Sequence, residues 1–153
     1  MELELDVQNA TGSLDVPTPD ELAHWTEAAL LGRRECAELT IRLVDEIEGA
    51  ELNRRYRGRE GPTNVLSFPF EPPPGLGHCD LIGDLVVCAP VVEREAREQG
   101  KRASAHWAHM VVHGVLHLLG YDHLTDVEAS EMEGLETAIL GGLGFAPPYE
   151  NGD

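Results

Sequence analysis

Alternating hydrophobic and polar residues predict the strands of this chain. Leu3, Leu5 and Val7 alternate with polar residues, which is the period-two pattern of a strand with one buried face. Three later apolar segments have the same character, and the Pro72–Pro74 run that follows one of them cannot join a sheet ladder. The four predicted strands lie at about residues 3–7, 38–46, 65–70 and 81–88.

Apolar residues at helical spacing predict five helices, at about 20–31, 50–56, 90–99, 105–119 and 126–141. Pro90 suits a first helical turn, and Ser104 is the expected N-cap of the fourth helix. In the last helix the expected inward residues are Val127, Met132, Leu135 and Ile139. The expected outward residues are Glu128, Glu131, Glu133 and Glu136.

The order of these elements predicts an α+β fold, in which helices pack around a small mixed four-stranded sheet. At 153 residues without a linker or an internal repeat, residues 1–153 are expected to form one domain. Gly141, Gly142 and Gly144 end the last helix, so residues 145–153 are expected to form a mobile acidic tail.

The composition is typical of a soluble protein, with 42% hydrophobic and 25% charged residues. No stretch reaches the roughly 18 apolar residues of a membrane span, and the acidic N-terminus is unlike a signal peptide. Cys36, Cys79 and Cys88 are widely spaced and contain no CxxC pair. We expect reduced thiols and a cytoplasmic location without membrane contact.

The net charge of −17 argues against a general nucleic-acid binder. Its distribution is uneven, because Arg54, Arg55, Arg57 and Arg59 fall within six positions. One interpretation of this run is a solvated helix end. The other is a local anion-binding patch on an acidic body, since the planar guanidinium offers paired donors to phosphate.

Three histidines carry the strongest chemical signal in the sequence. His113 and His117 are four residues apart and therefore project from one face of a helix. Gly120 can end that helix in a left-handed conformation, which lets the chain return and present His123 to the same point. Three neutral nitrogens suit one zinc ion per chain and leave a fourth position for a water, whose pKa falls to about 7. His109 is expected to contact substrate or form hydrogen bonds.

The spacing of the trio resembles the zinc-binding run of the metzincin proteases, His-Glu-x-x-His-x-x-Gly-x-x-His. In those proteases the glutamate after the first histidine is the general base. Here Gly114 occupies that position and has no proton-accepting side chain. This departure disfavours a peptidase and favours another substrate.

A metal site beside an arginine patch fits phosphodiester cleavage, because an arginine can stabilise the charge that develops on the phosphate oxygens. A metal-bound hydroxide or a ribose 2′-hydroxyl could be the nucleophile, and the sequence leaves both routes open.

Several segments together resemble the YbeY endoribonucleases, which are also called rRNA maturation factors. They are residues 51–58 (ELNRRYRG), 62–68 (PTNVLSF), 82–85 (IGDL), 113–123 (HGVLHLLGYDH) and 132–136 (MEGLE). The resemblance implies a zincin-like site with His113, His117 and His123 as zinc ligands, and Arg57 as the arginine that contacts phosphate. It also implies single-strand-specific cleavage in maturation of the small-subunit rRNA 3′ end and in ribosome quality control.

The partners implied by the resemblance are the small ribosomal subunit, a ribosomal protein and a ribosome-associated GTPase. Many members have aspartate where this chain has Asn64, and asparagine also occurs. Asp84 and Asp122 are candidates for orienting a ligand histidine or the substrate, or are turn and cap residues. Two alternative functions remain: a metal-dependent hydrolase of another substrate class, and a non-catalytic ribosome assembly factor with structural zinc.

Overall fold

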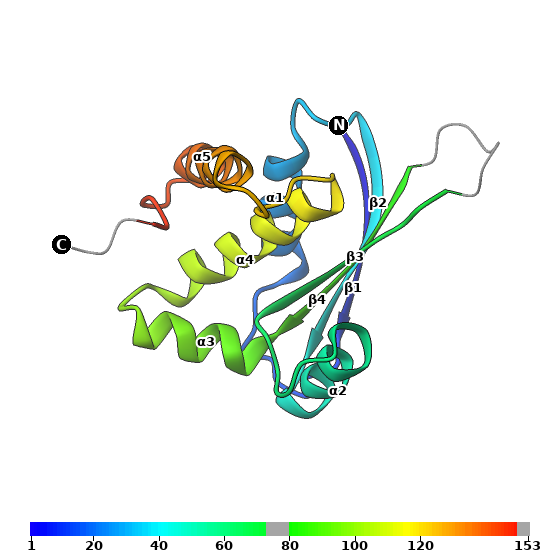
Figure 1. Cartoon of the computed structure of the whole chain (residues 1–153), viewed down its shortest axis with the longest axis vertical. Coiled ribbons are helices and arrows are strands. Elements are labelled where there is room, and N and C mark those ends of the chain that lie inside the picture. The colour runs from blue at the N-terminus through cyan, green and yellow to red at the C-terminus, as the bar shows by residue number, and fades with distance from the viewer. Residues whose placement is uncertain (73–79, 150–153) are drawn as a thin grey trace.

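The computed structural model describes residues 1–72 and 80–149, which form four strands and five helices (Figure 1). In chain order these elements are β1 (Glu2–Asn9), α1 (Pro19–Leu30), β2 (Cys36–Val44), α2 (Glu46–Arg57), β3 (Val65–Pro69), β4 (Leu81–Cys88), α3 (Ala89–Glu98), α4 (Ala103–Leu118) and α5 (Asp126–Gly142). The prediction of an α+β fold with a four-stranded sheet and about five helices is confirmed.

The sheet is mixed, with strand order β1-β2-β4-β3. β1 pairs with β2 and β2 with β4 in parallel, whereas β3 runs antiparallel to β4 and forms one edge. Figure 1 shows α1, α4 and α5 on one side of the sheet and α2 near the other. The larger hydrophobic core lies under α1 and α4, and a smaller cluster around Val44, Leu66 and Val86 lies on the opposite face.

Helix α4 lies at the centre of the core. Eleven of its sixteen residues are buried, and they include apolar side chains such as Trp107, Val111 and Leu116 as well as His106 and His109. A helix that is apolar on nearly all sides is stable only when other elements surround it. The sheet, α1, α3 and α5 all contact α4, and its histidines are therefore held by a rigid element.

Local capping explains two differences from the predicted boundaries. β2 ends at Val44 rather than residue 46, because Asp45 caps α2 by accepting a 2.9 Å hydrogen bond from the backbone N–H of Glu48. Helix α2 therefore starts at Glu46, earlier than predicted. Ser104 is not the N-cap of α4; it lies inside the first turn, and Arg102 is the N-cap without a capping side-chain bond.

In α5 one residue predicted to be buried is exposed, and one predicted to be exposed is buried. Val127, expected inward, is 77% exposed, while Glu136, expected outward, is fully buried. Met132 is buried, and Leu135 and Ile139 pack on the core, as predicted.

Residues 145–149, predicted to belong to a mobile tail, instead pack against the protein. Phe145 is packed on the core, and Lys101 donates a 2.7 Å hydrogen bond to the carbonyl of Pro148. The remaining residues of the predicted tail, 150–153, lie outside the described residues, as do Cys79 and most of the loop after Pro72. In the described ranges Cys36 and Cys88 are free thiols, and no helix has the length and apolar character needed to span a membrane.

Candidate metal centre

The end of α4 brings the third histidine back to the first two. Gly120 has a φ of +102°, the N–H of Gly120 donates to the carbonyl of His117, and the N–H of Tyr121 donates to that of Leu116. These two bonds form a Schellman motif, in which a left-handed residue after the helix reverses the chain. The predicted helix end at Gly120 is confirmed, and His123 follows the reversal.

His113, His117 and His123 present nitrogen atoms that all lie within 4.8 Å of one another. The Nε2 atoms of His113 and His117 are 3.2 Å apart. Two nitrogens bound at about 2.0–2.1 Å to one tetrahedral zinc would be about 3.3 Å apart. The donor set and its spacing therefore fit zinc.

The trio is open on one side. His113 and His117 are partly buried, whereas the His123 side chain is 55% exposed. A structural zinc site usually has four protein ligands, while a catalytic site keeps one position open for water or substrate. Three converging histidines at the protein surface match the second type.

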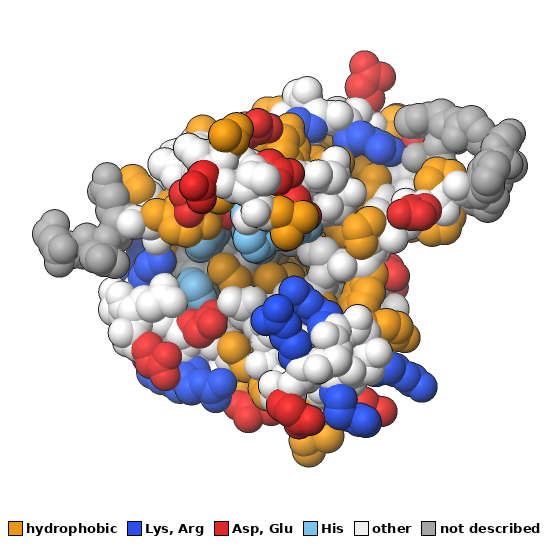
Figure 2. Space-filling model, in the orientation of Figure 1, with side chains coloured by type: hydrophobic (Ala, Val, Ile, Leu, Met, Phe, Trp, Pro, Cys, Tyr) orange, Lys and Arg blue, Asp and Glu red, His pale blue; other side chains and the backbone are white. Residues whose placement is uncertain are grey.

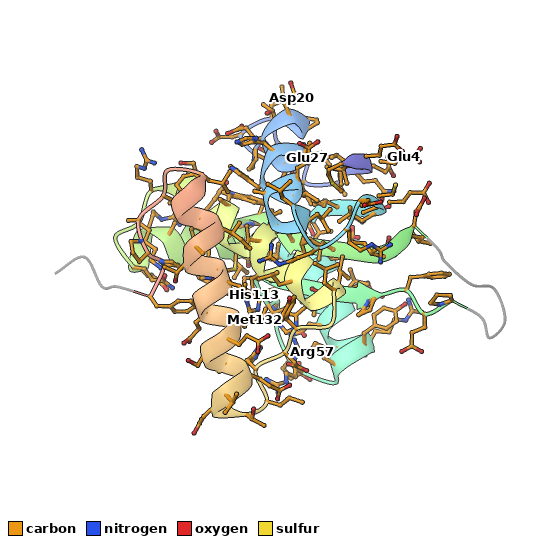
Figure 3. The ribbon with its side chains drawn as sticks, turned by 90° about the horizontal axis from the view of Figure 1, so that it is seen from above. Glu4, Asp20, Glu27, Arg57, His113 and Met132 are labelled. Atoms are coloured by element: carbon orange, nitrogen blue, oxygen red, sulfur yellow. The ribbon has the colours of Figure 1, made fainter. Side chains whose placement is uncertain are left out.

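The buried Glu136 forms a hydrogen bond with His113 of the trio. Its carboxylate is fully buried, and its Oε1 lies 2.7 Å from Nδ1 of His113. An Nδ1–H that donates to this oxygen leaves Nε2 of His113 unprotonated and directed toward His117, as a metal ligand requires. Figure 3 shows His113 beside α5, the helix that carries Glu136 and the labelled Met132.

His109, His113 and Glu136 form a second group with metal-ligand chemistry. Within it, the 2.7 Å separation between Glu136 and His113 is that of a charge-assisted hydrogen bond and is shorter than the spacing of two ligands around one zinc. His109 Nε2 lies 3.3 Å from Glu136 Oε2. We therefore assign this group as the hydrogen-bonded support of the trio.

Tyr149 completes the support. Its hydroxyl donates a 2.6 Å hydrogen bond to Glu136 Oε2 and lies 3.3 Å from His109 Nε2. Burial alone would raise the pKa of Glu136, but hydrogen bonds from His109, His113 and Tyr149 outweigh it and lower this pKa to about 2. Glu136 is therefore a carboxylate at neutral pH, while burial and the adjacent carboxylate raise the pKa of the Tyr149 phenol.

The surroundings of His117 also favour its neutral form, which is the form that could bind a metal. Burial lowers the pKa of His117, and the neighbouring His113 and His123 lower it further. A neutral imidazole retains the lone pair that binds a metal ion.

Gly114 has a packing role at the position where the proteases have glutamate. A Cβ atom there would lie 2.7 Å from Cδ2 of Leu85 and 3.2 Å from Cγ2 of Val65. The Gly114 carbonyl accepts a 3.1 Å hydrogen bond from the hydroxyl of Ser67. Glycine at this position lets α4 approach β3 and β4 closely, and a glutamate side chain here would have to displace the side chains of Leu85 and Val65.

A second polar cluster lies along α4. Glu95 accepts a hydrogen bond from Asn64 Nδ2 at 3.1 Å and lies 2.9 Å from His106 Nε2. These residues, with His109 and Tyr149, line a pocket of about 1090 Å³. Asn64 is thus held through its amide by Glu95.

The two candidate aspartates differ in position. Asp122 accepts a 2.8 Å hydrogen bond from the backbone N–H of His123, so it fixes the turn that carries this histidine. Asp84 is exposed on β4, where residues alternate between faces. Leu85 faces α4 and would contact a Cβ on Gly114, so Asp84 projects from the opposite face, away from the histidine helix.

Arg57 ends α2, and Gly58 caps this helix with a φ of +65°. Figure 2 shows histidine side chains in a hollow of the surface, with Lys or Arg side chains beside it over α2. Arg54, Arg55 and Arg57 are the basic residues in the last turn of that helix, and all are exposed.

Sequence patterns identify the histidine trio but not Glu136, Tyr149 or Glu95. A signal for Glu136 is present: Met132, Glu136 and Leu140 are spaced four apart, and both apolar neighbours are buried. No local pattern indicates Tyr149, because it reaches Glu136 from the segment after α5.

Two comparisons place the chain among known proteins. The solution structure of TM1509 from Thermotoga maritima, described as a structural target protein, superposes with a TM-score of 0.59 at 25% sequence identity. The match covers 94% of this chain and 99% of that one. The family model described as endoribonuclease YbeY matches residues 6–144. Since that match spans most of the sequence, the chain belongs to the YbeY endoribonuclease family.

Proposed function

We propose that this protein is a zinc-dependent, single-strand-specific endoribonuclease that acts in ribosomal RNA maturation. The observation that carries the proposal is the convergence of His113, His117 and His123, with the buried Glu136 carboxylate behind His113. Membership of an endoribonuclease family gives RNA as the substrate class. We also propose that the whole chain acts as a single catalytic domain.

The three histidines would hold one zinc ion, and their neutral forms are the ones that coordinate it. When bound, zinc supplies a Lewis acid that lowers the pKa of a coordinated water to about 7. Glu136 keeps the Nδ1 proton of His113 in place, and Asp122 fixes the turn before His123. These two contacts would orient His113 and His123 before substrate arrives.

Arg57 is the proposed phosphate-binding residue. Its guanidinium can pair with two oxygens of a phosphodiester and stabilise the negative charge that grows during cleavage. The last turn of α2 is exposed and rich in arginine, which supports this role. Removing such a donor from an active site typically lowers the rate by about 10²–10³-fold.

Two other functions are weaker. A peptidase of the metzincin type needs a base next to the first histidine, and Gly114, which stands there, has no side chain to supply one. A purely structural zinc would be expected to have four protein ligands, whereas the exposed His123 leaves this trio open.

The acidic charge bears on how the substrate is delivered. A protein of net charge −17 repels naked RNA over most of its surface. We propose that the small ribosomal subunit presents the rRNA 3′ end in the cytoplasm, with a ribosomal protein and a ribosome-associated GTPase as partners. Exposed acids of α5, such as Glu128, Glu131 and Glu133, would meet a basic partner. Replacing these three with glutamine should weaken ribosome association, and unchanged association would refute this part.

The substrate is tested by incubating the zinc-loaded protein with a single-stranded rRNA fragment, the same fragment in a duplex, and an unstructured peptide. We expect cleavage of the single strand alone. Arg57→Ala should reduce it by about 10²-fold or more. Arg97→Ala, which removes an exposed arginine from the last turn of α3, is the matched control and should retain activity. Peptide cleavage, or equal cleavage by Arg57→Ala and wild type, would contradict the proposal.

A further inference from the structure

An arginine-rich surface with one exposed tyrosine ring lies at the end of α2. Arg54, Arg55, Arg57 and Arg59 are all exposed. Between them, Tyr56 is 59% exposed, an unusual position for a large aromatic side chain in a surface helix. The chain thus combines four arginines and an exposed tyrosine ring within six residues.

The four arginines of this surface lack an ion-pair partner among the described residues. None of their side chains forms an ion pair or hydrogen bond with another residue in 1–72 or 80–149. By contrast, Arg42 and Arg94 pair with Glu48 and Glu46. Guanidinium groups without such partners leave their donors available to an external anion, on a chain whose net charge is otherwise −17.

The Tyr56 ring is held by a neighbouring aromatic side chain. Its ring packs edge-on against Phe68 of β3, with centroids 5.2 Å apart and an interplanar angle of 74°. Phe68 is itself packed on the smaller core, and it therefore fixes the orientation of the Tyr56 ring. The loop after α2 is also fixed, because the buried Asn53 donates a 2.7 Å hydrogen bond to the carbonyl of Gly61.

Strand β3 connects this surface to the metal centre. Phe68 projects from one face of β3, and its neighbour Ser67 projects from the other to reach the carbonyl of Gly114, the residue after His113. Because β3 is the edge of the sheet, a chain that crosses this edge can contact both faces. Figure 2 shows basic side chains beside the hollow that holds the histidines, and Figure 1, in the same orientation, places α2 in that region.

We propose that Tyr56, supported by Phe68, stacks against an unpaired base of single-stranded RNA as that strand crosses the β3 edge into the metal centre. The proposal rests on the endoribonuclease function proposed above. The arginines around Tyr56 hold the phosphates that flank the stacked base. Stacking on an aromatic ring needs a base that is not already stacked and paired in a duplex, so this surface selects single strands.

The test is equilibrium binding of a short fluorescein-labelled oligoadenylate to the zinc-loaded full chain, followed by anisotropy. Its 2′-O-methyl groups block attack by the ribose hydroxyl, and a denaturing gel checks that it stays intact. A second probe has the same backbone but abasic sugars. The variants are Tyr56→Ala, Tyr56→Phe and, as a matched control, Ile47→Ala, which removes another exposed apolar side chain from α2. Thermal melts establish that each is folded.

Loss of one base–aromatic stack weakens binding by about tenfold, within a range for such stacks of roughly five-fold to a hundredfold. Tyr56→Ala should show this loss for oligoadenylate only, Tyr56→Phe should restore wild-type affinity, and Ile47→Ala should have no effect. Equal affinities of wild type and Tyr56→Ala, an equal loss with the abasic probe, or no binding by wild type would overturn the proposal. Ring-dependent binding without cleavage of any RNA would retain this surface and reject the nuclease function instead.

Discussion

Glu136 Oε1 lies 2.7 Å from Nδ1 of His113, and this contact ties α5 to α4, the helix that carries His113 and His117. Glu136 is fully buried and accepts further bonds from Tyr149. The contact therefore favours one orientation of the imidazole and the tautomer with its proton on Nδ1. Such partners of a ligand histidine raise its basicity and hold it in place.

Replacing this carboxylate should weaken metal binding. In Glu136→Gln the side chain keeps its size but loses its charge, so the bond to His113 is weaker. We expect zinc affinity to fall about 10–100-fold, measured by competition with a chromophoric chelator. Glu133→Gln changes an exposed acid one turn earlier on α5 and should bind zinc as wild type does. Equal affinity of both variants would show that Glu136 does not orient the ligand.

Acid should remove a stabilising contribution from the metal-free protein. The pKa of Glu136 is lowered from 4.5 to about 2 in the folded state. A carboxyl group whose pKa is depressed by folding stabilises the protein above its unfolded pKa and loses that contribution as the pH falls through the folded value. The contribution, on the order of 3 kcal/mol, should therefore disappear between pH 4.5 and about pH 2.

This pH dependence is measured by urea unfolding of metal-free wild type and Glu136→Gln at a series of pH values. The difference in free energy of unfolding between wild type and Glu136→Gln should shrink as the pH falls from 4.5 to about 2. A difference that stays constant down to pH 2 would mean that Glu136 does not titrate with a lowered pKa.

The close packing of α4 on the sheet gives a prediction for Gly114. In Gly114→Ala the new methyl group meets Leu85 Cδ2 at 2.7 Å, so either the Leu85 side chain must shift or helix and strand must separate. We expect a loss of about 1–3 kcal/mol in the free energy of unfolding. Gly134→Ala is the matched control, because nothing lies within 4 Å of a Cβ there, and it should stabilise α5 by up to about 1 kcal/mol.

Combining Gly114→Ala with Leu85→Val tests the contact itself. If the two side chains clash, the double variant should be more stable than the sum of the single effects predicts. Purely additive effects would mean that the destabilisation by Gly114→Ala does not come from a clash with Leu85.

The packed segment after α5 can be tested through its tyrosine. Tyr149→Phe removes the 2.6 Å hydrogen bond to Glu136 but keeps the ring beside His109. Because Tyr149 is 49% exposed, water can replace part of the lost bond, and we expect a destabilisation of about 1 kcal/mol. For a chain of this length that lowers Tm by about 2–4 °C in a calorimetric scan. An unchanged Tm would mean that this segment does not stabilise the protein.

The strands, the order of elements and the histidine trio follow from the sequence because each depends on local spacing. β4 has the predicted bounds, 81–88, and Gly120 reverses the chain after α4 as its lack of a side chain allows. These features depend on residues within one or two turns of each other, and periodicity and cap chemistry describe them well.

The support of the trio could not be predicted in the same way. The sequence pattern places Glu136 on the exposed face of α5 because a carboxylate is normally solvated. Its burial depends on three hydrogen-bond donors that come from α4 and from the segment after α5. Likewise, only the tertiary structure shows that Asp84 faces away from α4. It alone shows that a side chain at position 114 would collide with Leu85.

The role of the histidine trio is tested by cleavage of a single-stranded rRNA fragment with protein of measured metal content, beside His117→Ala and Arg57→Ala. We predict about one zinc per chain and activity in the wild type, with activity lost after chelation and restored by zinc. His117→Ala should lose both zinc and cleavage, whereas Arg57→Ala should lose cleavage but retain zinc. Cleavage that survives in both variants, or in the zinc-free protein, would contradict the assignment of this centre as the catalytic site.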